Sequence, residues 1–307
     1  MRIYTLTLNP AYDVHVHAEH FVPFHENIAT VLSREAGGKG VNLSRGLLGA
    51  QVENTAVILM GTDNAADYRK QLQQDGVRFL ELENPGSIRE NITLHCDNAP
   101  ETRISFTGFT ARAGVLEEIF EAIAPGADTI LTMTGRIANG MDPEAVKAFL
   151  KKATDRGAKL VLDSRSFTLA DMGQLRPWLI KPNQEELATY SGEAAEDLPT
   201  ALTQARRLFA LGIENTMVSL GEKGALLVCP QGAYHAQPPK LAAVSTIGAG
   251  DSAIAGFLAA TVAGRSPEVC LQTAVAFGSA ACLTPGTKPP TAQAIATIFP
   301  QVRVTTM

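Results

Sequence analysis

The segment 245–252 has the residue types that phosphoryl transfer requires. It reads S-T-I-G-A-G-D-S, so two glycines flank an alanine and an aspartate follows directly. The apolar run 253–263 fits a helix whose first turn is the glycine segment. Glycines let backbone N–H groups crowd around an anion, and a helix N-terminus favours negative charge. An aspartate repels an anion, but it makes sense as a base that takes a hydroxyl proton while the amides stabilise the transferring group.

The motif alone leaves two other interpretations open. Gly-Ala-Gly-Asp could be a turn and N-cap before a buried helix. It also fits the dinucleotide pattern G-x-G-x-x-A, through Gly248, Gly250 and Ala253. That pattern should close an early strand, whereas here it comes late, and Glu268 follows an Arg-Ser-Pro that is typical of a helix start. A Walker A loop is not present, because no Ser or Thr follows the lysine of Gly-Gly-Lys-Gly at 37–40.

The composition is that of a compact globular protein with a substantial core. The chain has 307 residues, of which 45% are hydrophobic and 19% charged, and its net charge is −5. Without a basic stripe, extended nucleic-acid binding is disfavoured. The four cysteines form no C-x-x-C pair, which suggests neither a zinc site nor a disulfide framework. The longest apolar run is too short for a bilayer and no signal peptide precedes the strand-like run 3–8, so we expect a cytoplasmic protein without membrane or nucleic-acid partners.

From about residue 127 onward, strand-like and helix-like segments alternate. Strands are predicted at 129–133, 159–162, 178–181 and 216–220, and helices at 143–152, 184–190 and 200–211. Asp142 and Pro143 have the types of an N-cap and a first helical residue. This alternation predicts a parallel sheet with helices on both faces, in which ligands gather where strands end. The polar residues at those ends are Asn9, Asp13, Asp163, Lys181, Asn183, Ser219 and Gly221.

Other segments predict a small β-sheet standing off the main one. Residues 12–18 alternate strictly, and 87–96 and 102–106 flank a plausible hairpin turn, Asp-Asn-Ala-Pro. With 28–34 these segments could cover a site or form a dimer contact, although they could also be edge strands of the core sheet. His15, His17 and His20 invite a metal interpretation, but no carboxylate or cysteine partner has a compelling spacing. We therefore expect an exposed or dimer-facing strand there.

Six motifs follow one another in an order that resembles a known family. They are T-L-N-P-A-Y-D at 7–13, A-G-G-K-G-V-N-L at 36–43, R-E-N at 89–91, K-P-N-Q-E-E-L at 181–187, S-L-G-E-K-G at 219–224, and the segment 245–252. This order resembles the PfkB carbohydrate kinases of the ribokinase-like superfamily, in particular the branch of 1-phosphofructokinases and tagatose-6-phosphate kinases. The resemblance spans essentially the whole chain. It implies one α/β domain, 1–307: a three-layer α/β/α core with a mostly parallel sheet, plus a β-sheet lid formed by about 11–34 and 86–108 that could make a homodimer.

The resemblance also implies roles for individual residues. Asp251 would be the catalytic base, and the backbone amides of Gly248, Ala249 and Gly250 would form the anion hole. The residues expected to bind the sugar phosphate are Asp13, Gly38, Lys39, Asn42, Arg89, Arg103 and Arg136. Those expected to bind ATP are Lys181, Asn183, Ser219, Gly221, Thr246 and Gly278. Glu186 would help to hold Mg²⁺, through water. Asn42, Asn183 and Glu186 could also be ordinary polar residues at helix starts, and Arg103 a surface residue.

Two departures from the family pattern leave the sugar open. Arg136 replaces a small polar residue near the expected substrate site, and Arg165 follows Asp163-Ser164 where relatives have a small polar residue. The expected activity is ATP-dependent phosphorylation of a ketohexose phosphate, with fructose 1-phosphate giving fructose 1,6-bisphosphate. Glu26 and Asn27 stand where some 6-phosphofructokinases of the family carry basic residues. This resemblance favours the 1-phosphofructokinase or tagatose-6-phosphate branch over the fructose-6-phosphate branch. The alternatives are a tagatose-6-phosphate kinase, a kinase of nucleosides or unphosphorylated sugars, and a sugar-phosphate-binding regulator without turnover.

Overall fold

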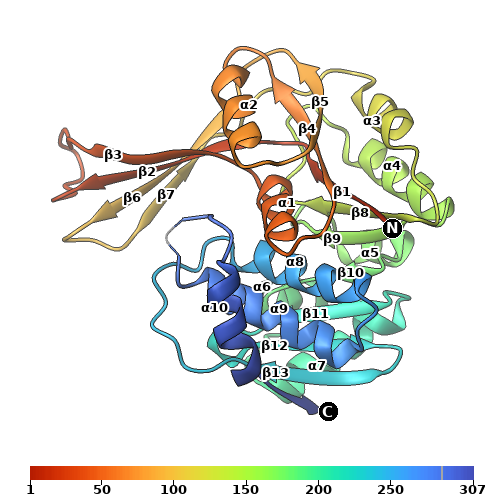
Figure 1. Ribbon diagram of the computed structural model, residues 1–307. Coiled ribbons are helices and arrows are strands. Elements are labelled where there is room, and N and C mark those ends of the chain that lie inside the picture. Colours follow the sequence, from red (N-terminus) through yellow and green to blue (C-terminus); the bar gives the residue numbers. More distant parts are fainter. Residues whose placement is uncertain (285) are drawn as a thin grey trace.

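A ten-stranded sheet runs through the computed structural model, which describes residues 1–284 and 286–307 (Figure 1). Its strands are β1 Arg2–Thr7, β4 Thr55–Gly61, β5 Phe79–Asn84, β8 Thr129–Thr134, β9 Lys159–Asp163, β10 Leu179–Ile180, β11 Asn215–Ser219, β12 Ala225–Cys229, β13 Gly232–Gln237 and β14 Arg303–Thr306. They lie in the order β14-β13-β12-β11-β10-β9-β8-β1-β4-β5. From β11 to β5 all neighbours are parallel, whereas β12, β13 and β14 add antiparallel strands at one edge.

Helices cover both faces of this sheet, which gives the predicted three-layer α/β/α arrangement. One face carries α1 Lys39–Gly49, α2 Ala65–Gln74, α8 Ala249–Val262, α9 Pro267–Ala281 and α10 Ala292–Ile298. The other carries α3 Val115–Ile123, α4 Pro143–Asp155, α5 Leu169–Leu175, α6 Gln184–Ser191 and α7 Leu198–Ala210. Alternate side chains of one strand serve the two layers: Ile3 packs with α1 and α8, and Leu6 with α3 and α4. Short 3₁₀ turns span Gly221–Lys223 and Phe299–Gln301.

The second sheet has four strands, in the order β3-β2-β6-β7, and projects from the body as an arm (Figure 1). Its strands are β2 Ala11–Ala18, β3 Thr30–Gly37, β6 Arg89–Cys96 and β7 Thr102–Ser105. The predicted hairpin is confirmed, since β6 and β7 pair antiparallel. The alternative of edge strands in the core sheet is wrong. β3 also runs three residues beyond the expected lid segment, because its pairing with β2 continues to Gly37 opposite Ala11. We call this four-stranded sheet the lid.

Most predicted elements of the core are confirmed, with small shifts at their ends. α4 begins at Pro143, and the Asp142 carboxylate accepts a hydrogen bond from the Glu144 N–H at 3.0 Å. The strand expected at 178–181 is shorter, Leu179–Ile180. α8 begins at Ala249, so the glycine segment is its first turn as expected. No helix in the described ranges is long and apolar enough to cross a membrane.

The histidine face of β2 corrects one expectation. His15 is buried instead of exposed, because its ring stacks on His95 of the paired strand β6, with Nδ1 and Nε2 2.9 Å apart. The segment after α9 covers the same ring, since a Cβ on Gly286 would lie 3.2 Å from His15 Nε2. His17 pairs with Asp97 at 3.0 Å near the surface. Within 1–284 and 286–307, no cluster of three or more His, Cys, Asp or Glu side chains could hold a metal ion.

Candidate active site

The N-terminus of α8 combines an open helix end with a buried carboxylate. Gly248 is the N-cap, with a positive φ of 78° that suits glycine, and it makes no side-chain cap. Its carbonyl accepts from the Ser252 N–H at 2.9 Å, so the helix is regular from its first turn. The first N–H groups of a helix have no partner within the helix, and they are therefore available to an anion. In α8 only the Ala249 N–H has a backbone contact in the described chain, a long one of 3.4 Å to the Thr246 carbonyl. Asp251 is the third residue of this turn and is only 6% exposed.

Burial raises the pKa of Asp251 to about 6, well above that of an ordinary carboxyl. The negative charge of Asp163 acts in the same direction, whereas the ammonium groups of Lys39 and Lys181 oppose it. A carboxylate tuned in this way is ionised at neutral pH and still basic enough to accept a proton. Such tuning is typical of general bases in enzymes.

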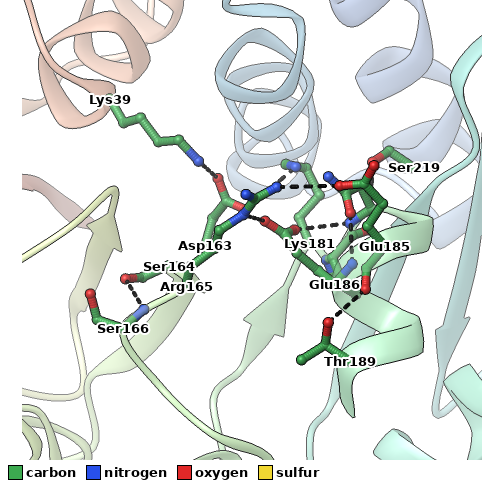
Figure 2. Close-up of polar contacts among 12 residues, drawn as sticks. Lys39, Asp163, Ser164, Arg165, Ser166, Lys181, Glu185, Glu186, Thr189 and Ser219 are labelled. Carbon is green, nitrogen blue, oxygen red and sulfur yellow. Dashed lines mark hydrogen bonds and ion pairs between the residues drawn. The ribbon is translucent and has the colours of Figure 1, made fainter. Parts of the chain in front are cut away.

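Asp163, at the end of β9, joins two lysines from distant parts of the chain (Figure 2). Lys39 Nζ lies 2.9 Å from one carboxylate oxygen, and Lys181 Nζ lies 3.4 Å from the other. Burial of Asp163 favours its neutral form, but the two ammonium groups outweigh this effect and lower its pKa. Partial burial likewise works against charge on Lys39, yet the carboxylates of Asp163 and Asp251 raise its pKa above the usual range. The result is a charged cluster beside the start of α8.

Lys181 also reaches the glycine turn itself. A Cβ built on Gly250 would lie 3.1 Å from Lys181 Nζ, so the ammonium group packs directly against this backbone. Lys181 is 7% exposed and is held there by Asp163. The site therefore has both orphan helix amides and a fixed positive charge at one place, which is the arrangement that stabilises a phosphoryl group in transfer.

The lid contributes a second cluster around Asp13 on β2. Asp13 Oδ1 accepts from Asn91 Nδ2 at 2.9 Å and pairs with Arg103 Nη2 at 3.0 Å. Arg103 is therefore more than the surface residue of the alternative: its side chain is partly exposed, but its guanidinium reaches the buried carboxylate of Asp13. Gly37 packs tightly against this carboxylate, because a Cβ there would come within 2.3 Å of Asp13 Oδ2 and force the side chain to shift.

Three arginines gather at this end of the site. Burial lowers the pKa of Arg89, and the positive charges of Arg103 and Arg136 lower it further, while Asp13 opposes them. Arg89 Nη1 donates to Asn91 Oδ1 at 2.8 Å and to the Phe106 carbonyl at 2.9 Å, and its buried Nε has no partner among the described residues. Crowded guanidinium groups of this kind favour an anionic ligand, above all a phosphate.

The start of α1 lies between the two clusters. Its N-cap is Gly38, with φ 115° and no side-chain cap, and the Asn42 N–H closes the first turn on the Gly38 carbonyl at 2.9 Å. Asn42 Oδ1 is buried and lacks a partner in the described chain, and its side chain acts to lower the pKa of Asp251. Gly135 packs on the Lys39 side chain, which brings the loop that carries Arg136 to the same end of α1.

The start of α6 is closed by its own side chains. Asn183 Oδ1 accepts from the Glu186 N–H at 2.8 Å, and Glu186 Oε2 accepts from the Asn183 N–H at 3.0 Å. This capping box realises the helix-start alternative for both residues. The other oxygen of Glu186, Oε1, lies 2.8 Å from Arg165 Nε (Figure 2). Ser219 lies beside this turn, because its N–H donates to the Pro182 carbonyl at 3.0 Å.

Three further residues expected to bind ATP lie in three different elements of the fold. Thr246 is exposed just before α8, and its carbonyl accepts from the Ala249 N–H at 3.4 Å. Gly221 follows β11 with φ 61°, and a Cβ there would meet open space. Gly278 lies under α8, since its Cβ would come 3.2 Å from the Ala249 carbonyl oxygen. The contact observed for Gly278 is therefore close packing of α9 against α8.

Two residues were not assigned to the site from sequence. The sequence identifies Asp163 only as a polar residue at a strand end, whereas the structure makes it the link between Lys39 and Lys181. The sequence identifies Arg165 only as a departure from the family pattern, whereas in the structure it pairs with Glu186. The position of Asp163 after a buried strand was the available signal, because that edge of a parallel sheet is where ligands bind.

Comparison with known proteins agrees with this geometry. The pfkB family carbohydrate kinase model matches residues 13–294. The chain is 30% identical to 1-phosphofructokinase of Bacillus subtilis over 99% of both chains, and 30% identical to that of Haemophilus influenzae over 90% of both. Among solved structures, Escherichia coli phosphofructokinase-2 in complex with substrates and products superposes with a TM-score of 0.91 at 25% identity, covering 98% of this chain and 99% of that one. The chain therefore belongs to the pfkB family of carbohydrate kinases. It is a sugar-phosphate kinase with the ribokinase-like fold.

Proposed function

We propose that the protein transfers the γ-phosphoryl group of ATP to fructose 1-phosphate, which gives fructose 1,6-bisphosphate and ADP. The observation that carries this proposal is the buried Asp251 in the first turn of α8, directly beside open helix amides and the Lys181 ammonium group. Base and anion cradle must be neighbours, because proton removal and phosphoryl transfer occur at the two ends of one forming O–P bond. The curated relatives named 1-phosphofructokinase support this choice of substrate.

The residues of the site divide the chemistry between them. Asp251 takes the proton of the attacking sugar hydroxyl as the hydroxyl oxygen bonds to the γ-phosphorus, and ADP leaves with the electrons of the broken P–O bond. The amides of Gly248, Ala249 and Gly250, with Lys181, stabilise the oxygens of the transferring group. Asp163 holds Lys181 in position through their ion pair.

A phosphorylated sugar suits the lid end of the site better than a neutral one. Arg103 pairs with Asp13, and Arg89 feels the positive charge of both Arg103 and Arg136. The phosphate of the substrate would balance this excess of positive charge. Asp13 and the orphaned Asn42 Oδ1 would accept hydrogen bonds from sugar hydroxyls, with Gly38 admitting the sugar close to the backbone. Lys39 would add charge toward the same phosphate. Tagatose 6-phosphate carries the same groups and is the alternative substrate.

The nucleotide would lie along the starts of α6 and α8. Asn183, Ser219, Gly221 and Thr246 border this region, and Gly278 supports it from beneath. No described cluster of acidic residues forms a metal cage, whereas Mg²⁺ commonly keeps several waters and binds through nucleotide phosphates and one or two carboxylates. Glu186 fits that role, and Mg²⁺ bound with ATP would neutralise phosphate charge.

The lid suggests a homodimer. It exposes Val31 and Leu32 on β3, Ile104 on β7, and Phe106, which directly follows β7. Each of these four residues is at least half exposed. Exposed apolar residues gathered on one projecting element favour a protein partner, and a second copy would cover them. Light scattering should show a dimer that the double variant V31D/I104D converts to monomers, and a monomeric wild-type protein would contradict this proposal.

The test of the function is ADP release with Mg-ATP against a panel of acceptors: fructose 1-phosphate, tagatose 6-phosphate, fructose 6-phosphate, fructose, ribose and a nucleoside. We expect strong turnover of fructose 1-phosphate that D251N abolishes. Preference for tagatose 6-phosphate would replace the substrate but keep the mechanism. Turnover of uncharged acceptors alone would overturn the role of the arginine cluster, and ligand-induced stabilisation without turnover would indicate a non-catalytic regulator.

A further inference from the structure

The ion pair between Arg165 and Glu186 places a cation of the chain on the carboxylate expected to serve the metal (Figure 2). Arg165 lies just after β9, and Glu186 is in the first turn of α6. Their closest atoms, Nε and Oε1, are 2.8 Å apart, and Arg165 Nη2 lies 3.8 Å from Glu185 Oε2. Two acidic side chains therefore share one guanidinium group at the nucleotide end of the site.

Both carboxylate oxygens of Glu186 already have a partner within the chain. Its second oxygen, Oε2, already accepts the Asn183 N–H of the capping box at 3.0 Å. Both oxygens are thus engaged, one by a backbone amide and one by a full positive charge. The amide contact holds the carboxylate in place, while the Arg165 contact is the exchangeable one, because the Arg165 side chain is 60% exposed and that of Glu186 is 18% exposed.

Electrostatics gives this contact a consequence for nucleotide binding. Without a cation, the Glu186 carboxylate would repel the phosphates of ATP, and with a divalent cation it would attract the metal nucleotide. Arg165 weakens both the repulsion of metal-free ATP and the attraction of the metal nucleotide, because its positive charge neutralises Glu186 before any metal binds. A metal that approaches Glu186 must displace Arg165 or share the carboxylate with it.

We propose that Arg165 sets how strongly nucleotide binding depends on a divalent cation, by neutralising Glu186 when no metal is bound there. The proposal rests on the assignment of ATP as the phosphoryl donor. Arg165 acts through Glu186, and is therefore a positioning residue, distinct from Asp251 and the glycine turn.

The test is calorimetric binding of a non-hydrolysable ATP analogue to the full chain, once with excess MgCl₂ and once with excess EDTA. The measured quantity is the dissociation constant in EDTA divided by the dissociation constant in MgCl₂. In R165S we expect this ratio to rise about two- to fivefold over wild type, the size of a partly exposed ion pair. The rise should vanish in the E186Q background, where R165S/E186Q should have the same ratio as E186Q alone. R207S is the matched control, because the Arg207 side chain is 59% exposed and its Nη1 lies 3.5 Å from Glu193 Oε2, in an ion pair outside the site. The ratio for R207S should equal that of wild type.

Each outcome separates this proposal from the proposed function. A ratio that is unchanged in R165S, or that rises equally in the E186Q background, would overturn the role of the ion pair while leaving nucleotide use intact. A ratio that falls in R165S would also overturn it, since Arg165 would then assist the metal-bound nucleotide directly. If the wild-type protein binds no analogue in either buffer, both this proposal and the assignment of ATP fail.

Discussion

The starts of α6 and α8 lie in the same site and have an acidic residue at the same helical position, yet they are built in opposite ways. In α6 the third residue, Glu186, bonds back to the N-cap Asn183, and Asn183 caps the Glu186 amide in return. In α8 the third residue is Asp251, the N-cap is glycine, and no side chain closes the turn. One helix start is closed by its own side chains, and in the other only the long contact from the Ala249 N–H to the Thr246 carbonyl, 3.4 Å, competes with a ligand for the first amides.

The difference shows how a carboxylate near a helix start becomes either a structural or a chemical group. Glu186 gains a backbone hydrogen bond on one oxygen and an exchangeable guanidinium on the other. Asp251 is more buried and has lysines nearby that do not cap it, which leaves its pKa at about 6. The Gly248 N-cap of α8 thus gives up a little capping stability, about a few tenths of a kcal/mol, and leaves the turn without a side-chain cap beside a base.

Exchanging each acid for its amide is the sharpest way to break this comparison. D251N should lower kcat about 10²–10⁴-fold, the usual worth of a positioned base, without lowering the melting temperature, because burial disfavours the charge that the substitution removes. E186Q keeps an oxygen for the Asn183 N–H and should lose far less activity. Steady-state kinetics and thermal unfolding of both variants provide the measurement. Equal losses in kcat would show that the two helix starts do not differ in function.

The pH profile tests the same difference through Asp251 alone. The base works when ionised, so with a pKa of about 6 kcat/KM should be level above that pH and fall about tenfold per unit below it. K39M should move this acidic limb to higher pH, since the Lys39 ammonium lowers the pKa of Asp251. The measurement is the initial rate between about pH 5 and pH 8, a range that brackets the titration of such a base, with the stability of the protein checked at each pH. A limb near that of an ordinary carboxyl would mean that Asp251 is not the buried base.

The sequence was informative where function depends on neighbours along the chain. The glycine turn, Asp251 and the capping pair Asn183 and Glu186 each lie within a few residues, so their spacing predicts their geometry. The contact between Lys39 and Asp163 joins residues 124 positions apart, and only the parallel sheet brings them within 2.9 Å. The burial of His15 depends in the same way on a paired strand, which is why the expectation of exposure was wrong.

Removing caps separates the structural part of the comparison from the chemical part. N183A deletes the side-chain cap of α6 and should cost about 1 kcal/mol of unfolding free energy. T168A is a matched control, because Thr168 and Asp171 form a capping box at the start of α5 in the same manner. Urea unfolding should give similar losses for the two variants, whereas only N183A should raise the KM for ATP, since it loosens the first turn of α6, which carries Glu186, by removing the acceptor of the Glu186 N–H. If both variants raise that KM equally, loosening of the fold would explain the effect, and the α6 cap would have no particular role in the nucleotide site.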